Sequence, residues 1–456
     1  MIRHHYRAPN VLGEASFAWR RSAGVGMAGV RASFHVSVAA LHTLRMNTES
    51  MLLGRQPILD RHGCMYAYEL LFRNSAQNAA TVHDAALATR QLLHHLFADI
   101  GVERALGPYR GFVNCDSQLL MKPGALDMLP TRHIVLEVLE TVEPTCDVVA
   151  RCRELKTAGF MLALDDYVGD HDRYADLLPL LDVLKVDLAR VQPDKLERIV
   201  GEAARVKALL LAEKVETRTQ KDACEKLGFD LFQGYFFARP AMLSKRKLGV
   251  PQKALMRILS LLMQEGDDAL IEDAFKLQPR LSVNLLKLVN STAPTSSQRV
   301  DSLGQAISVL GRRAMARWVQ LLLYTAPDQR SMVNPLLQLA ATRGRLMENL
   351  ALRLWKNDLE RSDQAFMVGI LSLMPALFSA PLAEILQQLP LAPSAIEGLL
   401  QRSGPLGGLL ESVVALEARP LDATLLPPGI DGEAFNASLT EAMGWANNIG
   451  QPAATR

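Results

Sequence analysis

Eight short apolar runs recur between residues 52 and 240 and set the pattern of the first half of the chain. Helix-like stretches such as "DAALATRQLLHHLFADI" and "CDVVARCRELKTAG" separate them. Strands that alternate with helices at this spacing predict βα units and a mainly parallel sheet. The runs are "QPILD", "YAYELLF", "GFVN", "HIVLEVLE", "MLALDD", "VLKVD", "LLLAEKV" and "LFQGYFF".

The second half of the chain has a different pattern, which begins after Pro240. The stretch "AMLSKRKLGVPQ" has the composition of a linker. The remainder is rich in Leu, Ala and Met at helical spacing, which predicts an all-α domain. We expect an N-terminal extension over 1–50, a barrel domain over 51–240, a linker over 241–250, a helical domain over 251–440 and a tail over 441–456.

The first 45 residues differ from both halves, because they hold six arginines, no lysine and a single acid, Glu14. A targeting segment, a disordered arm and sequence upstream of the true start all fit this composition. We favour the last, with a start at Met46 or Met51, and assign no function to the segment.

Six polar residues stand at or near the ends of apolar runs, at separations of 23, 28, 20, 28 and 20 residues. Each separation matches one βα unit. In a (β/α)8 barrel, the carboxyl ends of successive strands meet at one mouth, where the active site forms. The spacing therefore predicts a TIM-like (β/α)8 barrel that gathers these residues at its mouth. They are Asn114, Glu137, Asp165, Lys185, Glu213 and Gln233.

Carboxylates, an amide and a lysine around one mouth suit a hard divalent cation such as Mg²⁺ or Mn²⁺. The adjacent Asp165 and Asp166 can serve two ions, which stabilise the attacking and leaving oxygens in phosphodiester hydrolysis. In such a site Lys185 orients water or neutralises charge, and Glu213 accepts the proton of the water. An enolase-type barrel, which abstracts a proton beside a carboxylate, uses the same residue types, so the pattern leaves the substrate open.

Composition and charge narrow the class of protein. An apolar fraction of 49 % with 21 % charged residues is typical of soluble globular proteins. A net charge of +2 favours neither DNA nor a membrane surface as a partner. Five cysteines without CxxC spacing predict reduced thiols and a cytoplasmic location.

Seven motifs follow one another in register across the first half of the chain. They are "YELLFR" at 68–73, "FVN" at 112–114, "LEVLET" at 136–141, "LDD" at 164–166, "KVD" at 185–187, "AEKVET" at 212–217 and "QGYFFARP" at 233–240. Over about 190 residues this series closely resembles the EAL domain of cyclic di-GMP phosphodiesterases, with Leu70 in place of the alanine of the signature tripeptide. The resemblance implies hydrolysis of cyclic di-GMP to pGpG with two ions of Mg²⁺ or Mn²⁺.

The resemblance also carries over four kinds of residue role. The residues that match metal ligands are Glu69, Asn114, Glu137 and Asp165, with Asp166 for a second ion. Those that match catalytic positions are Lys185 and Glu213, which handle the attacking water, and Glu216 and Gln233, which support them. Those that match substrate contacts are Gln56, Arg73 and Arg239. Glu140 matches the glutamate that anchors the loop after the paired aspartates.

That loop departs from the family pattern. EAL enzymes usually have a glycine-rich loop of the kind DDFGTGYSSL, whereas this chain has "DDYVGDHDRYADLL", with two further acids, Asp170 and Asp172. In the family the loop helps to hold the second metal and links catalysis to dimerisation. The ligand positions are therefore retained while the loop that positions them is altered.

The helical half resembles the HDOD domain, a relative of the HD hydrolases, through "LLKLVNS" at 285–291 and "SLGQAISVLG" at 302–311. In HD hydrolases a segment similar to "AFMVGILSLMP" supplies a His-Asp metal pair, and here Ser372 and Leu373 occupy those places. The last histidine of the chain is His171, so this half cannot form an HD metal site. The resemblance implies a regulatory or protein-binding domain.

Two functions stay open from the sequence. The first is a metal-dependent cyclic di-GMP phosphodiesterase with a regulatory HDOD domain, and we favour it because every matched metal position holds the expected residue. The second is a receptor or scaffold without turnover, since EAL–HDOD composites as a class often have degenerate barrels. A homodimer is implied by the family alone.

Overall fold

The computed structural model describes most of the chain beyond residue 50. The described residues are 51–74, 101–127, 129–238, 250–264, 267–292, 300, 302–325, 334–356, 358–378, 380–419 and 422–449. The expected extension over 1–50, the helical pattern at 84–100 and most of the expected linker lie outside them, as does Arg239.

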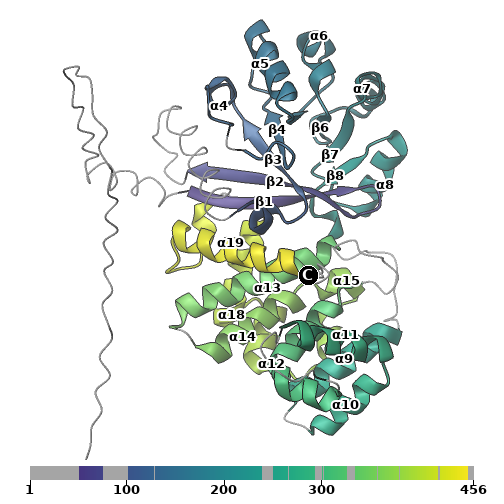
Figure 1. Cartoon of the computed structure of the whole chain (residues 1–456), viewed down its shortest axis with the longest axis vertical. Coiled ribbons are helices and arrows are strands. Elements are labelled where there is room, and N and C mark those ends of the chain that lie inside the picture. The colour runs from purple at the N-terminus through teal and green to yellow at the C-terminus, as the bar shows by residue number, and fades with distance from the viewer. Residues whose placement is uncertain are drawn as a thin grey trace, which may run out of the picture. The chain divides into compact units, whose positions relative to one another are not determined.

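Each of the eight apolar runs overlaps one strand of a closed barrel, which confirms the predicted architecture (Figure 1). The strands are β1 (Met51–Asp60), β2 (Met65–Asn74), β3 (Arg110–Cys115), β4 (Ile134–Val138), β5 (Met161–Leu164), β6 (Val183–Asp187), β7 (Leu209–Glu213) and β8 (Leu231–Gln233). Neighbours from β2 to β8 pair in parallel, as the βα alternation predicts.

Strand β1 is the exception, because it runs antiparallel to both β2 and β8. A tight turn over residues 61–64 connects it to β2. Asp60 Oδ1 accepts hydrogen bonds from the backbone N–H groups of His62 and Cys64 at 2.9 and 2.8 Å. Gly63 supplies the positive φ of +74° that this turn needs. The local turn chemistry therefore produces the hairpin that reverses β1.

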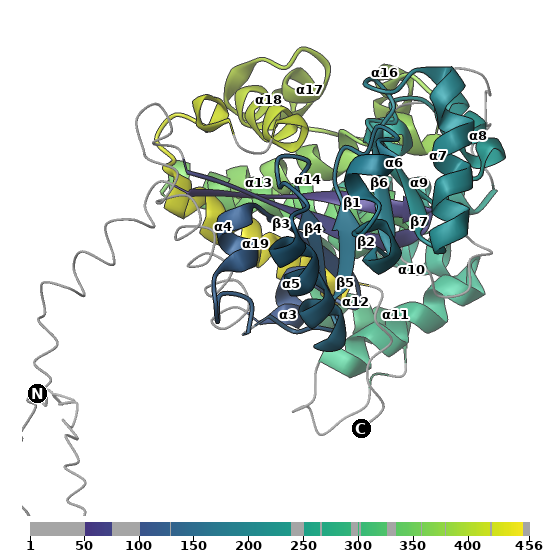
Figure 2. The same ribbon diagram turned by 90° about the horizontal axis from the view of Figure 1, so that it is seen from above.

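Helices cover the outside of the barrel (Figure 2). They are α3 (Val102–Leu106), α4 (Ser117–Met121), α5 (Cys146–Thr157), α6 (His171–Tyr174), α7 (Pro193–Val206) and α8 (Arg218–Leu227), with 3₁₀ turns at Leu178–Leu180 and Tyr235–Phe237. Local signals fix their ends: Thr217 and Gln220 form a reciprocal capping box at the start of α8, and Gly228 ends it in the left-handed region.

The barrel interior is closed by one apolar side chain from each strand, which we call the floor layer. Its members are Ile58, Ala67, Phe112, Val135, Ala163, Val183, Leu211 and Leu231. All eight are at most 2 % exposed, so the barrel is a packed core below its mouth.

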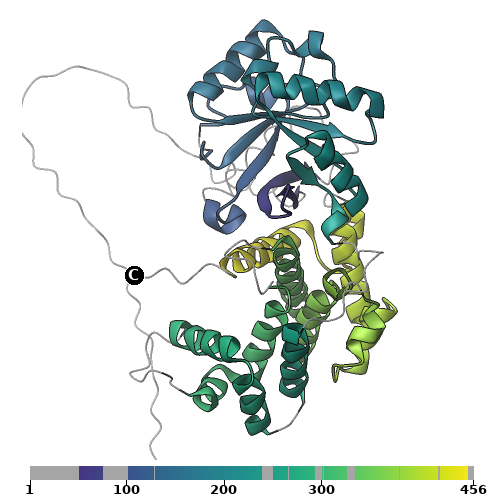
Figure 3. The ribbon, with the colours of Figure 1, turned by 90° about the vertical axis from the view of Figure 1, so that its right-hand side faces the viewer.

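The second half is helical throughout its described residues, as predicted (Figure 3). Its helices are α9 (Val250–Met263), α10 (Asp268–Lys276), α11 (Pro279–Thr292), α12 (Leu303–Leu322), α13 (Pro335–Leu354), α14 (Leu359–Leu371), α15 (Met374–Phe378), α16 (Leu382–Leu386), α17 (Pro393–Leu400), α18 (Gly404–Ala418) and α19 (Gly432–Asn448), with a 3₁₀ turn at Ala423–Leu425. Helices α13 and α14 approach closely because Gly344 faces Gly369, where an added Cβ would lie 2.8 Å from the Cα of Gly344.

Two further observations concern the cysteines and the apolar length of the helices. All five cysteines lie within the described part of the chain and are free, in keeping with reduced thiols. Within the same ranges, no helix is both long and apolar enough to cross a membrane.

Candidate active site

A ring of polar side chains lies directly above the floor layer. Side chains alternate between the two faces of a strand, so the residue two positions nearer the mouth points into the same interior. On all eight strands that residue is polar. The members of this mouth ring are Gln56, Glu69, Asn114, Glu137, Asp165, Lys185, Glu213 and Gln233. The structure thus brings together the six residues singled out by their spacing.

Lys185 is the centre of the mouth ring and is 1 % exposed. Its Nζ lies 2.8 Å from Glu213 Oε1, 3.1 Å from Asp165 Oδ1 and 3.7 Å from Glu69 Oε1. It also donates a hydrogen bond to Glu137 Oε1. One ammonium therefore faces four carboxylates, and the ring keeps a surplus of negative charge.

Two amides orient the ring and leave oxygen atoms free. Gln233 Nε2 donates to Glu69 Oε2 at 2.5 Å and to Gln56 Oε1 at 2.9 Å, and Asn114 Nδ2 donates to Glu69 Oε1 at 3.3 Å. Among the residues that the structure describes, the acceptor oxygens Asn114 Oδ1 and Gln233 Oε1 are buried without a hydrogen-bond partner, and so is Glu137 Oε2. Buried polar atoms in folded proteins are normally satisfied, so these oxygens indicate a cation that the residues can hold.

Burial and charge shift three pKa values in the ring. Burial raises the pKa of Glu213 to about 7, although Lys185 opposes the shift. Burial also raises the pKa of Glu137 well above its ordinary value, and Glu69 and Asp165 add to this. Burial alone would lower the pKa of Lys185, but the surrounding carboxylates outweigh it and raise the pKa, so the lysine keeps its proton.

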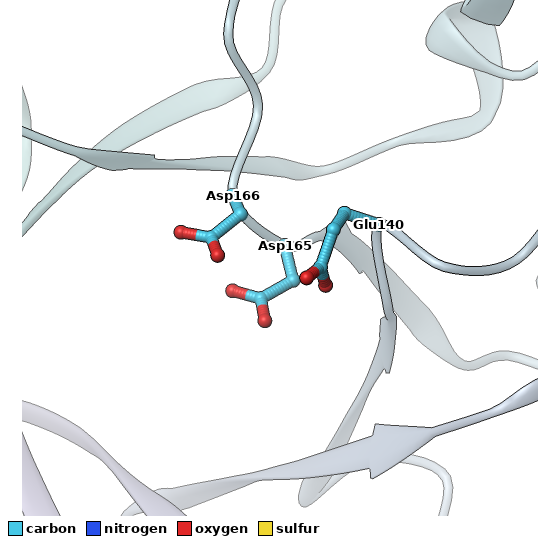
Figure 4. A group of neighbouring side chains, drawn as sticks. All are labelled: Glu140, Asp165 and Asp166. Carbon is cyan, nitrogen blue, oxygen red and sulfur yellow. The ribbon is translucent and has the colours of Figure 1, made fainter. Parts of the chain in front are cut away.

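The second aspartate, Asp166, belongs to a group of three acids that shares Asp165 with the mouth ring. Carboxylate oxygens of Glu140, Asp165 and Asp166 all lie within 4.8 Å of one another, with Glu140 following β4 and the aspartates following β5 (Figure 4). Asp166 has a φ of +47°, in the left-handed region. Arg190, just after β6, forms an ion pair with its carboxylate. The sequence analysis did not identify Arg190, although a basic residue three positions after a strand end is a usable signal.

The altered loop is hydrogen-bonded to the backbone carbonyl of Glu140. Arg173 Nη2 and Tyr174 Oη donate to the Glu140 carbonyl at 3.2 and 3.4 Å. Tyr167, 1 % exposed, donates its hydroxyl to Glu202 Oε2 at 2.5 Å. The loop after the paired aspartates and the short helix α6 are therefore held by hydrogen bonds to Glu202 and to the Glu140 carbonyl.

The remaining predicted site residues are less fully placed. Glu216 is exposed in the loop after β7, and its backbone N–H donates to Gln220 Oε1 at 2.9 Å as part of the segment that caps α8. Arg73 belongs to β2, but its side chain lies outside the described residues. Gln56, a member of the mouth ring, accepts a hydrogen bond from Gln233 Nε2.

In the helical half, an arginine faces the position at which HD hydrolases carry their histidine. Arg343 Nη1 donates to Ser372 Oγ at 2.7 Å, and its other nitrogens pair with both carboxylate oxygens of Glu417. Leu373, at the aspartate position, is 4 % exposed. These two positions therefore hold a hydrogen-bonded hydroxyl and a buried apolar side chain.

Comparisons with known proteins agree with both halves. A model of the EAL domain matches residues 45–240, and a model of the HDOD domain matches residues 248–391. The "Uncharacterized protein YuxH" of Bacillus subtilis is 30 % identical over 407 residues, which cover 88 % of this chain and 98 % of that protein. The "Cyclic di-GMP phosphodiesterase CdgJ" of Vibrio cholerae is 30 % identical over 404 residues, which cover 87 % and 92 %.

The similarity of this chain to a solved structure is much weaker. The structure titled "PaMucR Phosphodiesterase, c-di-GMP complex" is 22 % identical, with a TM-score of 0.34, over 44 % of this chain and 97 % of that one. At that TM-score it adds nothing to the assignment. The two domain matches and the two relatives, each aligned over more than nine tenths of its own length, show that this chain belongs to the EAL–HDOD family.

Proposed function

We propose that the barrel hydrolyses cyclic di-GMP to the linear dinucleotide pGpG in a reaction that depends on Mg²⁺ or Mn²⁺. The name of the V. cholerae relative supports the substrate. The observation that carries the proposal is the pair of unpartnered buried oxygens, Asn114 Oδ1 and Glu137 Oε2, in a ring with surplus carboxylates. Such a donor set fits a hard divalent cation.

The residues that would hold the first cation are Glu69, Asn114, Glu137 and Asp165, and Asp166 would hold a second. When bound, the cations lower the pKa of water and stabilise negative charge on the phosphate. This role fits the donor set, because these acceptor atoms are buried and make no hydrogen bond to a described residue.

Lys185 and Glu213 would manage the protons of the reaction. Glu213, with a pKa of about 7, is suited to take a proton from the attacking water near neutral pH. Lys185 keeps its own proton and holds Glu213 Oε1 at 2.8 Å. Attack of the water oxygen on phosphorus breaks one P–O bond, and the departing ribose oxygen ends protonated. We assign substrate contacts to Gln56, Arg73 and Arg239, and support of the ring to Gln233 and Glu216.

A second candidate function rests on the ion pair between Arg190 and Asp166. If Arg190 keeps the second cation out, the barrel binds cyclic di-GMP without turnover and acts as a receptor or scaffold. In either case we propose that the protein is cytoplasmic, that its helical domain regulates the barrel or binds a partner protein, and that it forms a homodimer.

One assay separates the two functions. The full chain is incubated with cyclic di-GMP and Mn²⁺, and pGpG is quantified by chromatography for the wild type, Glu69→Ala and Glu154→Ala. Glu154 is an exposed acid on α5, so its variant serves as the matched control. We expect turnover in the wild type and the control and none in Glu69→Ala. Tight binding without pGpG would favour the receptor, and turnover in Glu69→Ala would overturn the site assignment.

A further inference from the structure

A cavity of about 80 Å³ lies behind the β1–β2 hairpin, where helices α13, α18 and α19 pack against it. Most of its wall is apolar and includes Leu339, Leu346 and Leu439. One water needs about 10–15 Å³ of such space, so the cavity has room for several waters or for one small organic molecule.

Two buried polar atoms in this wall have no hydrogen-bond partner within the described part of the chain. Tyr68 and Gln338 both line the cavity and are each 3 % exposed, and neither Tyr68 Oη nor Gln338 Oε1 makes a hydrogen bond with any described residue. The Gln338 amide is held in place because its Nε2 donates to the Ala446 carbonyl at 3.1 Å. A buried hydroxyl or amide left unpaired costs about 1–3 kcal/mol, so both atoms indicate a missing polar partner.

The cavity also carries a positive charge that no acid of the described residues balances. Arg55 donates to the Ala105 carbonyl at 3.1 Å and to Thr342 Oγ1 at 3.2 Å, and its guanidinium lies 4.1 Å from the ring centroid of Tyr68. Within those residues it forms no ion pair with a carboxylate, and burial lowers its pKa. Arg343, on the same wall, is neutralised by Glu417. The net charge of the wall is therefore positive.

We propose that this cavity is a binding site for a small amphipathic carboxylate, such as an aromatic acid or a short fatty acid. The carboxylate would accept from Arg55 and from Tyr68 Oη, and the apolar body would lie against Leu339, Leu346 and Leu439. A carboxylic-acid or hydroxyl hydrogen elsewhere on the ligand would satisfy Gln338 Oε1. Inorganic anions would leave the apolar wall unused.

The site lies on the reverse side of two strands that carry the mouth ring. Arg55 and Tyr68 directly precede Gln56 and Glu69, and adjacent residues of a strand point to opposite faces. Gln56 pairs with Glu69 across the hairpin, so one pair of strands presents the cavity on one face and the mouth ring on the other. A ligand in the cavity would therefore contact the strands that position Gln56 and Glu69. Binding itself does not depend on the proposed hydrolysis.

The test uses the full chain and isothermal titration with benzoate, octanoate and acetate, with benzamide as the neutral analogue. We expect benzoate and octanoate to bind at least tenfold more tightly than acetate or benzamide. Tyr68→Phe, which keeps the aromatic ring beside Arg55, should weaken the binding of benzoate at least fivefold. Leu339→Trp, which fills the cavity, should abolish binding.

Gln320 provides the matched control, because its Oε1 is also buried with no hydrogen-bond partner in the described ranges but it does not line the cavity. Gln338→Met should weaken the binding of a hydroxybenzoate, whereas Gln320→Met should not. Thermal unfolding confirms that each variant is folded. Absence of carboxylate binding to the wild type, or binding that Tyr68→Phe and Leu339→Trp leave unchanged, would overturn the proposal. So would a crystal structure grown with benzoate that shows only water in the cavity.

Discussion

Removal of the central lysine gives the sharpest test of the electrostatics of the mouth ring. In Lys185→Met, four carboxylates would face one another without a counter-charge. At an effective dielectric constant of about 20, each ionised carboxylate 2.8–3.7 Å from Nζ contributes about 4–6 kcal/mol of attraction, which desolvation of the ions largely offsets. Loss of one partner of a buried ion pair costs about 3–5 kcal/mol. We therefore expect the free energy of unfolding of metal-free Lys185→Met at pH 8 to be about 3–5 kcal/mol lower than that of the wild type.

The same reasoning predicts how the loss responds to pH and to metal. The pKa values of Glu137 and Glu213 are already raised, and without Lys185 they would rise further. These acids are then neutral at pH 5, so most of the destabilisation should disappear there. Added Mn²⁺ should also restore stability at pH 8, because a divalent cation can replace the ammonium.

The assay is urea unfolding of the metal-free wild type and variant at pH 5 and pH 8, with and without Mn²⁺. Lys221→Met is the control, since Lys221 is also mostly buried but pairs with a single carboxylate, that of Glu225. It should lose little stability at either pH and gain nothing from Mn²⁺. A Lys185→Met loss that is equal at pH 5 and pH 8 and indifferent to Mn²⁺ would refute the reasoning.

Three other predictions concern stability and are measured by urea unfolding of the metal-free protein. The raised pKa of Glu213 means that the folded protein favours the neutral form of this acid. As the pH rises from 4.5 to 7, the free energy of unfolding of the wild type should therefore fall by about 3 kcal/mol more than that of Glu213→Gln. The same pH profile in both proteins would contradict this. Gly234→Ala should lower the free energy of unfolding by more than about 2 kcal/mol, because Gly234 has a φ of +144° and an added Cβ would lie 2.1 Å from a backbone oxygen. Gly201 lies in open space on α7, so Gly201→Ala should raise the free energy of unfolding by up to about 1 kcal/mol. Arg343→Met should cost about 3–5 kcal/mol by leaving Glu417 unpaired, and adding Glu417→Leu should recover part of that loss; a double variant no more stable than the single would argue against the ion pair.

Much of the mouth ring could be predicted because the short-range pattern of apolar and polar residues identifies each strand and the direction of its side chains. The two-residue alternation of side chains fixes that Glu137 and Val135 share one face of a strand, and parallel pairing brings strand ends to the same edge. Apolar runs of four to eight residues that end in a polar residue therefore indicate both the strand and the site. The same local signal explains why the all-α character of the second half could be predicted.

Contacts between distant segments left no such signal. The ion pair of Arg190 with Asp166 depends on the course of two loops, and the hydrogen bonds of Arg173 and Tyr174 to Glu140 depend on how α6 packs. The reversal of β1 follows from a four-residue turn that resembles many others. The cavity behind the hairpin forms where three helices of the second half approach β1 and β2. The periodicity of apolar residues in the sequence does not predict this packing.

The central claim is that this barrel uses water to open the phosphodiester ring of cyclic di-GMP. The most direct measurement is mass spectrometry of the product after incubation of the full chain with cyclic di-GMP and Mn²⁺ in ¹⁸O-labelled water. Our account predicts pGpG with one ¹⁸O atom in its terminal phosphate, formed by the wild type and not by Glu69→Ala. Cyclic di-GMP that is bound and recovered intact would contradict it.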